Sequence, residues 1–253
     1  MEPDGAAAKV GKMLTMFPHS NTTGGFHPLD RSSHLTDLVY APIHDRQKLD
    51  LHLSDMSGSP MPLLIWIHGG AWLGGDKSEI PLAVTQLQSR WRVALASVGY
   101  RLSEHAIWPA QLADVMAALH WLRANARKYN LDTERVFVMG HSAGGHLAAM
   151  LGTIGMGAER VSGVVDLSGP TNISSFEEDD ELCGCPYEDN HFCPFCPETL
   201  LLGCSPPACP ELAQYASPVR SHHNHLLLTP HPSPLTPHPS LLTTHRLLPP
   251  TDC

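Results

Sequence analysis

The chain has 253 residues, of which 42% are hydrophobic, and its formal net charge is −9. This length suits one large domain or two small ones, and an acidic chain without a basic cluster excludes nucleic acid and anionic membrane as expected partners. No stretch approaches the roughly 20 apolar residues of a membrane span, and the N-terminus holds no signal-peptide-like apolar segment. We therefore expect a soluble, cytoplasmic protein, and we leave its oligomeric state open.

Composition divides the chain into three parts. Residues 1–36 are small and polar, and we expect them to be poorly ordered. Residues 37–219 carry the regular apolar patterns of a folded core. Residues 220–253 are rich in proline, histidine and leucine and contain the near-repeat "TPHPSPL" and "TPHPSLL". So many prolines without a helical or strand period predict a disordered tail.

Six short apolar runs in the core are predicted to be strands. The run "KLDLHLS" alternates between apolar and polar residues, as a half-exposed strand does. The runs "PLLIWIH" and "RVFVMG" are continuous, which is typical of strands buried on both faces of a parallel sheet. The six predicted strands are Leu38–Pro42, Lys48–Leu53, Pro62–His68, Val93–Gly99, Arg135–Gly140 and Val161–Leu167.

Two helices are predicted among these strands. One opens at Pro109 and covers "PAQLADVMAALHWLRANARKYN", because proline is tolerated in a first helical turn and apolar residues then recur every three or four positions. The other is Ala143–Leu151. Two antiparallel-looking strands followed by alternating strands and helices predict an α/β fold with a mostly parallel sheet covered on both faces.

A serine lies between glycines where a predicted strand meets a predicted helix. Residues 140–144, "GHSAG", match G-x-S-x-G, in which a sharp, strained turn lifts the serine hydroxyl above the sheet. The N-terminus of the following helix favours a developing negative charge there. We interpret Ser142 as a nucleophile. The alternative is an ordinary glycine-rich helix start.

A second glycine motif, "IHGGAW", follows the predicted strand that ends near His68. Consecutive glycines after a strand can turn their amides toward a cavity. Together with the amide of Ala143, the amides of Gly69 and Gly70 would hold the oxyanion of a tetrahedral intermediate. The alternative is a plain glycine turn.

Several segments in this order resemble a known family. They are "LLIWIHGGAW", "SVGYRLSEHAIWPAQLADV", "WLRANARKYNLD", "VMGHSAGGHLAAMLG" and "VSGVVDLSGPTNI". They resemble the α/β-hydrolase superfamily and, within it, carboxylesterases with an HGG motif, both hormone-sensitive-lipase-like and feruloyl-esterase-like. The resemblance covers about residues 37–219. It implies a three-layer α/β-hydrolase sandwich that cleaves a small-molecule carboxylic ester, without metal or organic cofactor, and it makes His68 a support of its loop.

The acid and base of this family follow the serine in the order Asp, His, each behind a further strand. Only 34 residues follow Val219, and no such strand is recognisable among them. A base must be held within about 3 Å of the hydroxyl, which a segment without a scaffold does not achieve. The tail offers only weak candidates, namely His222, His223, His225, His231, His238, His245 and Asp252.

The other polar and aromatic residues of the core are not assigned catalytic roles. We expect Asp166 to orient the following "SGPTN" loop rather than to serve as the acid. His146 is expected to be packed or exposed, and His141 to project from another side of the turn. Trp72 and Trp108 either line a substrate pocket or simply pack.

A missing acid and base leave two hypotheses open. One is a serine carboxylesterase that is impaired as written, and the other is a catalytically incomplete remnant with at most a binding role. Both assume a chain truncated at its C-terminus, with the last strands of the sheet missing. The strand at 161–167 would then be an exposed edge, which predicts low solubility and marginal stability.

A cysteine-rich segment precedes residue 209 and gives a third, weaker hypothesis. Its spacings, C-x-C and C-x2-C with His191 nearby, suit zinc, disulfides in an oxidising compartment, or no role. The pairs are closer than in common zinc ribbons, so the predicted site contains no metal. The acidic run Glu177–Glu181 is interpreted as a solvated loop. The cysteines of the motif are Cys183, Cys185, Cys193 and Cys196, to which Cys204 and Cys209 add little.

Overall fold

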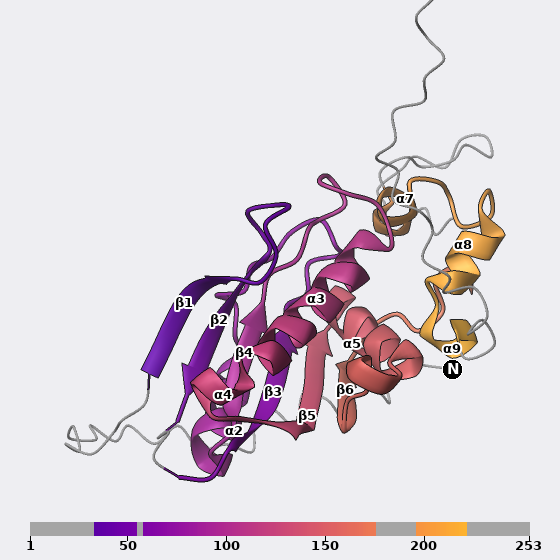
Figure 1. The fold of residues 1–253 in the computed structure, drawn as a ribbon. Coiled ribbons are helices and arrows are strands. Elements are labelled where there is room, and N and C mark those ends of the chain that lie inside the picture. Colours follow the sequence, from indigo (N-terminus) through magenta and orange to yellow (C-terminus); the bar gives the residue numbers. More distant parts are fainter. Residues whose placement is uncertain (1–32, 55–57, 176–195, 222–253) are drawn as a thin grey trace, which may run out of the picture. The chain divides into compact units, whose positions relative to one another are not determined.

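The structure, a computed structural model, describes residues 33–54, 58–175 and 196–221. These residues form a six-stranded mixed sheet in the order β1-β2-β4-β3-β5-β6 (Figure 1). The first pair and the β2–β4 pair are antiparallel, and the remaining neighbours are parallel. The mostly parallel α/β sheet expected from the sequence is therefore confirmed. The strands are β1 Ser33–Val39, β2 Lys48–Leu53, β3 Met61–Ile67, β4 Ala94–Val98, β5 Leu131–His141 and β6 Gly163–Leu167.

Helices cover both faces of the sheet. Helices α3 (Ala110–Ala124) and α5 (Ala143–Ile154) pack on one face, where the larger apolar cluster lies. Helix α2 (Leu82–Trp91) covers the other face, against Leu64 and Trp66 of β3. Because side chains alternate along a strand, β3 contributes to both clusters, which explains its continuous apolar run. The shorter helices are α4 Ala126–Tyr129, η1 Gly157–Glu159, η2 Ile173–Ser175, α7 Pro197–Leu202, α8 Pro210–Tyr215 and α9 Pro218–Ser221.

The first strand differs from its prediction. It begins at Ser33, inside the segment 1–36 that was expected to be poorly ordered, and ends at Val39 rather than at Pro42. The extent of β1 follows its pairing with β2, which runs from Ser33 to Val39 with a register shift between Leu35 and Leu38. The chain then turns away, since the Tyr40 amide bonds to Gln47 O and its hydroxyl donates to Gly99 O. A local apolar run did not reveal this pairing.

The predicted long helix after Pro109 is interrupted. It ends at Ala124, and the side-chain amide of Asn125 donates to Trp121 O at 2.8 Å, after which the short α4 follows. Helix α2 was not predicted from its sequence, and its single buried residue is Val84. An apolar stripe that narrow is a weak periodic signal.

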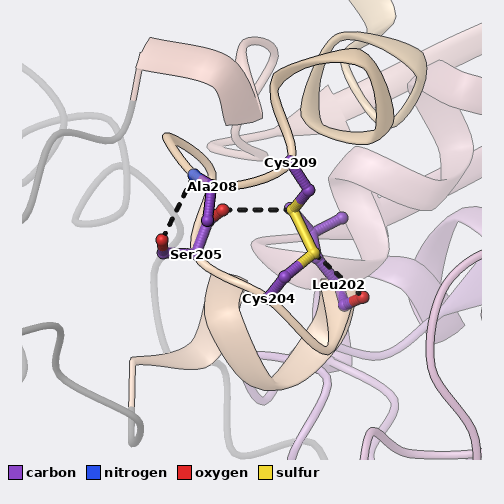
Figure 2. Close-up of a disulfide and its surroundings, with 5 residues drawn as sticks. All are labelled: Leu202, Cys204, Ser205, Ala208 and Cys209. Atoms are coloured by element: carbon purple, nitrogen blue, oxygen red, sulfur yellow. Dashed lines mark hydrogen bonds between the residues drawn. A yellow bond between two sulfur atoms is a disulfide. The ribbon is translucent and has the colours of Figure 1, made fainter.

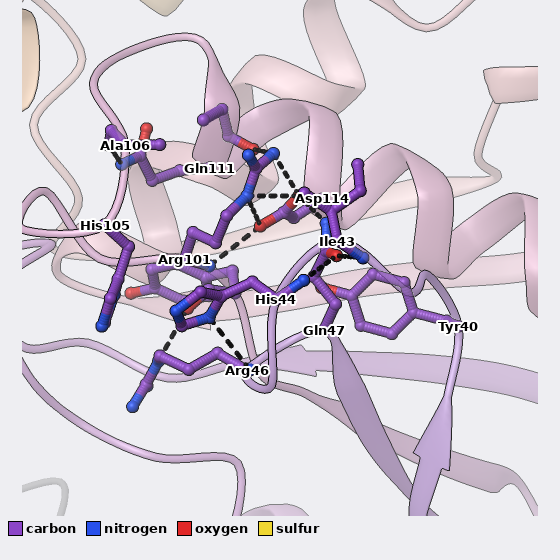
Figure 3. Close-up of polar contacts among 12 residues, drawn as sticks. Tyr40, Ile43, His44, Arg46, Gln47, Arg101, His105, Ala106, Gln111 and Asp114 are labelled. Atoms are coloured by element: carbon purple, nitrogen blue, oxygen red, sulfur yellow. Dashed lines mark hydrogen bonds and ion pairs between the residues drawn. The ribbon is translucent and has the colours of Figure 1, made fainter.

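A buried ion pair fixes the segment that follows β4. Asp114 of α3 accepts three side-chain bonds from Arg101, of 2.9 and 3.2 Å from Nε and 2.7 Å from Nη2, and one from the Arg101 amide at 2.9 Å (Figure 3). Gln47 donates to the same carboxylate at 2.6 Å. These bonds satisfy a carboxylate that is otherwise costly to bury. They join α3, the turn before β2 and the segment carrying Tyr100.

A disulfide joins Cys204 and Cys209 between α7 and α8 (Figure 2). These two cysteines were expected to add little, so that interpretation was wrong. Cys196 is also disulfide-bonded, whereas Cys183, Cys185 and Cys193 lie outside the described residues. The cytoplasmic location expected from the sequence stays a prediction. Among the described residues, no helix is both long enough and apolar enough to cross a membrane.

Candidate active site

Ser142 occupies a sharp turn between β5 and α5. Its backbone has φ 53° and ψ −121°, a conformation that residues other than glycine rarely adopt. Its amide donates to Leu167 O at 2.9 Å, and its carbonyl accepts from the His146 amide at 3.0 Å. The turn is therefore held by β6 on one side and by α5 on the other.

The two glycines of the pentapeptide are required by backbone proximity. A Cβ on Gly140 would lie 2.1 Å from Gly144 O. A Cβ on Gly144 would lie 2.2 Å from Ile67 O and 2.5 Å from His68 O. Any side chain at either position would collide with backbone rather than with a flexible group. The glycines thus let α5 start directly against the end of β3.

The serine side chain lies next to the second glycine motif. Ser142 is partly exposed and makes no capping bond to its helix. A Cβ on Gly69 would lie 3.3 Å from Ser142 Cβ, so the two chain segments touch. The amide of Ala143 is the first of α5 and has no acceptor within the helix. The structure therefore brings together Ser142, Gly69 and Ala143.

Residues 68–75, hereafter the glycine loop, form a tight turn after β3. The amides of Leu73 and Gly74 both donate to Gly70 O at 2.9 Å. Three successive residues have positive φ, 114° at Gly70, 53° at Ala71 and 57° at Trp72. Such a conformation costs of order 1–3 kcal/mol at each non-glycine residue and persists only when its surroundings impose it. Burial of the Trp72 side chain provides part of that constraint.

His68 is a buried part of the glycine loop, with 1% of its surface exposed. Its Nδ1 lies 2.7 Å from Gly69 O, and its ring stacks on Tyr100 at 4.4 Å between centroids. The Tyr100 hydroxyl donates to His68 O at 3.0 Å. Burial lowers the pKa of the imidazole, which favours its neutral form. The imidazole therefore contacts its own loop rather than Ser142.

His146 is packed, one of the two outcomes expected for it. It is fully buried, its Nε2 lies 2.7 Å from Ala216 O, and burial lowers its pKa to about 4. Its ring meets Trp72 at 5.1 Å and Trp108 at 5.4 Å between centroids. The two tryptophans, each 2% exposed, thus pack around a histidine.

Asp166 behaves as expected from the sequence. Its Oδ1 accepts a 2.6 Å bond from the Gly169 amide and so orients the loop after β6. The same oxygen would lie 2.2 Å from a Cβ on Gly145, so the carboxylate sits against the second residue of α5's glycine pair.

A cavity of about 390 Å³ borders His141, the residue before Ser142. His141, which is exposed, contributes to its wall. Gly69 belongs to the same wall, so this space lies beside the glycine loop. The lining residues are Trp66, His68, Gly69, Ser78, Glu79, Ile80, Pro81 and His141.

No acid–base pair is assembled on Ser142 within the part of the chain that the structure describes. The imidazoles of His68 and His146 bond to Gly69 O and Ala216 O. The tail candidates between residues 222 and 252, His191 and the run 177–181 all lie outside the described residues. The described residues also hold no group of three or more metal-ligating side chains.

The BD-FAE family model matches residues 49–223 of the chain. Among curated proteins, Esterase LipC of Mycobacterium tuberculosis (strain ATCC 25618 / H37Rv) is 41% identical over 99 residues. That match is 39% of this chain and 24% of LipC, so the chain spans about a quarter of the length of this relative.

Solved structures agree with these matches. A chain described as "Bifunctional GH43-CE Bacteroides eggerthii" is 29% identical with a TM-score of 0.63, covering 74% of this chain and 26% of that one. A "Truncated form of carbohydrate esterase from gut microbiota" is 27% identical with a TM-score of 0.63, covering 74% and 72%. The α/β-hydrolase fold expected from the sequence is confirmed. That further strands of this fold are missing stays a prediction.

Proposed function

Because the chain belongs to the BD-FAE family, we propose that it is a serine hydrolase of carboxylic esters with Ser142 as its nucleophile. One observation carries the proposal: the positive-φ turn at Ser142 touches the glycine loop at Gly69. Two motifs more than 70 positions apart in the sequence therefore meet at one point, where α5 begins. The esterase names of LipC and of the carbohydrate esterase support the same bond type.

The proposed reaction has two steps. Ser142 Oγ attacks the ester carbonyl carbon, and the carbonyl oxygen becomes an oxyanion held by the amides of Gly69, Gly70 and Ala143. The alcohol leaves with a proton, and water then cleaves the acyl-enzyme and releases the acid. Losing one such amide donor typically costs 10²–10³-fold in rate. The 390 Å³ cavity beside Gly69 has room for one part of a small ester.

A second candidate function is that of a non-catalytic remnant that binds a ligand. The observation that favours it is that His68 and His146 are both engaged elsewhere. A positioned general base contributes about 10²–10⁴-fold to such reactions. A site with the amide donors alone would therefore be slow but not inert.

Turnover of p-nitrophenyl butyrate by the purified full chain separates the two. For a hydrolase, we expect saturable turnover that Ser142→Ala reduces at least 10³-fold. Ser89→Ala, an exposed serine on α2, is the matched control and should leave turnover unchanged. Equal, unsaturable hydrolysis by the wild-type chain and Ser142→Ala, with both folded by circular dichroism, would establish the remnant.

A further inference from the structure

Arg46 reaches the glycine loop from the turn between β1 and β2. Its amide donates to His44 Nδ1 at 3.2 Å, a contact visible in Figure 3. Its side chain extends the other way, with Nε donating to Tyr100 O at 2.9 Å and Nη2 donating to Gly75 O at 2.6 Å. The same Nη2 lies 3.5 Å from His68 Nε2. The guanidinium therefore bridges the loop and the segment after β4.

These contacts favour one position for the proton of His68. A guanidinium has only N–H donors, so a hydrogen bond across the 3.5 Å between Arg46 Nη2 and His68 Nε2 forms only when Nε2 accepts. A neutral imidazole with an accepting Nε2 has its proton on Nδ1. That nitrogen lies 2.7 Å from Gly69 O, which only accepts. Donor and acceptor then match at both ends of the ring.

The orientation of the Gly69–Gly70 peptide depends on this proton. The peptide is trans, so the carbonyl of Gly69 and the amide of Gly70 point in opposite directions. The carbonyl faces His68 and Gly75, because a Cβ on Gly75 would lie 2.4 Å from both Gly69 O and His68 Nδ1. The Gly70 amide consequently points away from His68. With the proton on Nε2, a lone pair on Nδ1 would face the carbonyl oxygen, and the peptide would be repelled.

We propose that Arg46 is a positioning residue of the esterase site, which selects the Nδ1–H tautomer of His68 and thereby orients the Gly70 amide as an oxyanion donor. This inference rests on the proposed function for its catalytic consequence, but not for the tautomer itself. Stacking on Tyr100 holds the ring plane, so the proton position is the variable that Arg46 controls. A purely structural role for Arg46 would stabilise the loop without choosing between the tautomers.

The direct test is ¹⁵N NMR of the full chain labelled at histidine and glycine, near neutral pH. In the wild-type chain we expect His68 to show a protonated Nδ1 and an unprotonated Nε2. Arg46→Lys, which still presents only donors, should keep this tautomer, whereas Arg46→Gln, whose amide oxygen can accept, should shift population to Nε2–H. The Gly70 amide resonance should move only in Arg46→Gln. A wild-type His68 protonated on Nε2 would overturn the proposal even if Arg46→Gln fails to fold, and so would a tautomer unchanged in a folded Arg46→Gln.

Ester kinetics provide the catalytic readout. We expect Arg46→Gln to lower kcat for p-nitrophenyl butyrate about tenfold or more with KM nearly unchanged, because the amide acts mainly on the transition state. Arg46→Lys should restore most of kcat. A fall in kcat with an unchanged tautomer would contradict the inference. If no variant and no wild-type chain hydrolyses esters while the tautomer shifts as expected, the proposed function fails and the control of the His68 proton by Arg46 stands.

Discussion

The two sides of the Ser142 turn differ in how completely their polar groups are paired and their apolar groups buried. On the side of the glycine loop, both His68 nitrogens and the carbonyls of Gly69 and Gly75 have partners. On the side of β6, the strand lies at the end of the described sheet, with Val164, Val165 and Leu167 exposed by 36%, 41% and 39%. The buried Nδ1 of His146 also has no hydrogen-bond partner among the residues that the structure describes.

This contrast separates two tasks of the site. The glycine loop, which would stabilise an oxyanion, is held both by its own turn and by contacts from the distant residues Arg46 and Tyr100. The part that would move protons is not assembled among the described residues. A reactive serine and a fast enzyme are therefore different expectations, and the chain can satisfy the first without the second.

The largest expected effect is on stability, and it concerns the contact between α5 and the end of β3. Gly144→Ala should lower the free energy of unfolding by about 3 kcal/mol or more, because its Cβ would strike the backbone at the end of β3. Gly74→Ala is the matched control, since a Cβ there meets nothing within 4 Å, and it should change stability by less than about 0.5 kcal/mol. Urea denaturation measures both. Equal effects would show that the contact between α5 and β3 does not constrain the turn.

The next effect is the pH dependence of stability that His146 produces. The folded pKa of His146 is about 4, below its unfolded value near 6.5, so the unfolded chain binds the proton first as the pH falls. Stability is full above pH 6.5 and should decline by about 3 kcal/mol between pH 6.5 and pH 4 from this group. His146→Gln keeps a donor for Ala216 O but does not titrate. Its urea stability should fall less steeply with pH, and parallel curves would refute a buried neutral His146.

The smallest effect compares the two edges of the sheet. Val165→Lys should change the free energy of unfolding by less than about 0.5 kcal/mol but reduce self-association in sedimentation velocity, because a charge interrupts an exposed apolar edge. Val39→Lys, on the bulged edge strand β1 and 53% exposed, is the control and should change little. A wild-type chain that stays monomeric at high concentration would contradict the predicted low solubility.

Local patterns in the sequence predicted much of this structure. The continuous run of β3 and the "GHSAG" pentapeptide each carry their own physical reason, namely burial on both faces and backbone crowding around the glycines. The Asp166 contact with Gly169 spans three residues, so its geometry was also accessible to local reasoning. In each case the partners are near in sequence or the constraint is steric.

Contacts between distant segments were not predictable in the same way. Arg46 and His68 are 22 residues apart, and no spacing rule links them. His146 meets Ala216 across 70 positions, and nothing in "GGHLAAM" distinguishes a buried histidine from an exposed one. The extent of β1 likewise depended on its pairing with β2 rather than on its own apolar run. Such features follow from the fold as a whole.

Labelling with a fluorophosphonate tests the central claim most directly, because it reports an activated serine without requiring complete turnover. We expect one adduct per folded chain, mapped to Ser142 by peptide mass spectrometry, absent in Ser142→Ala and absent after unfolding in urea. Ser89→Ala should label like the wild-type chain. A folded wild-type chain that takes up no label, or labels equally in Ser142→Ala, would contradict a reactive serine at the junction of β5 and α5.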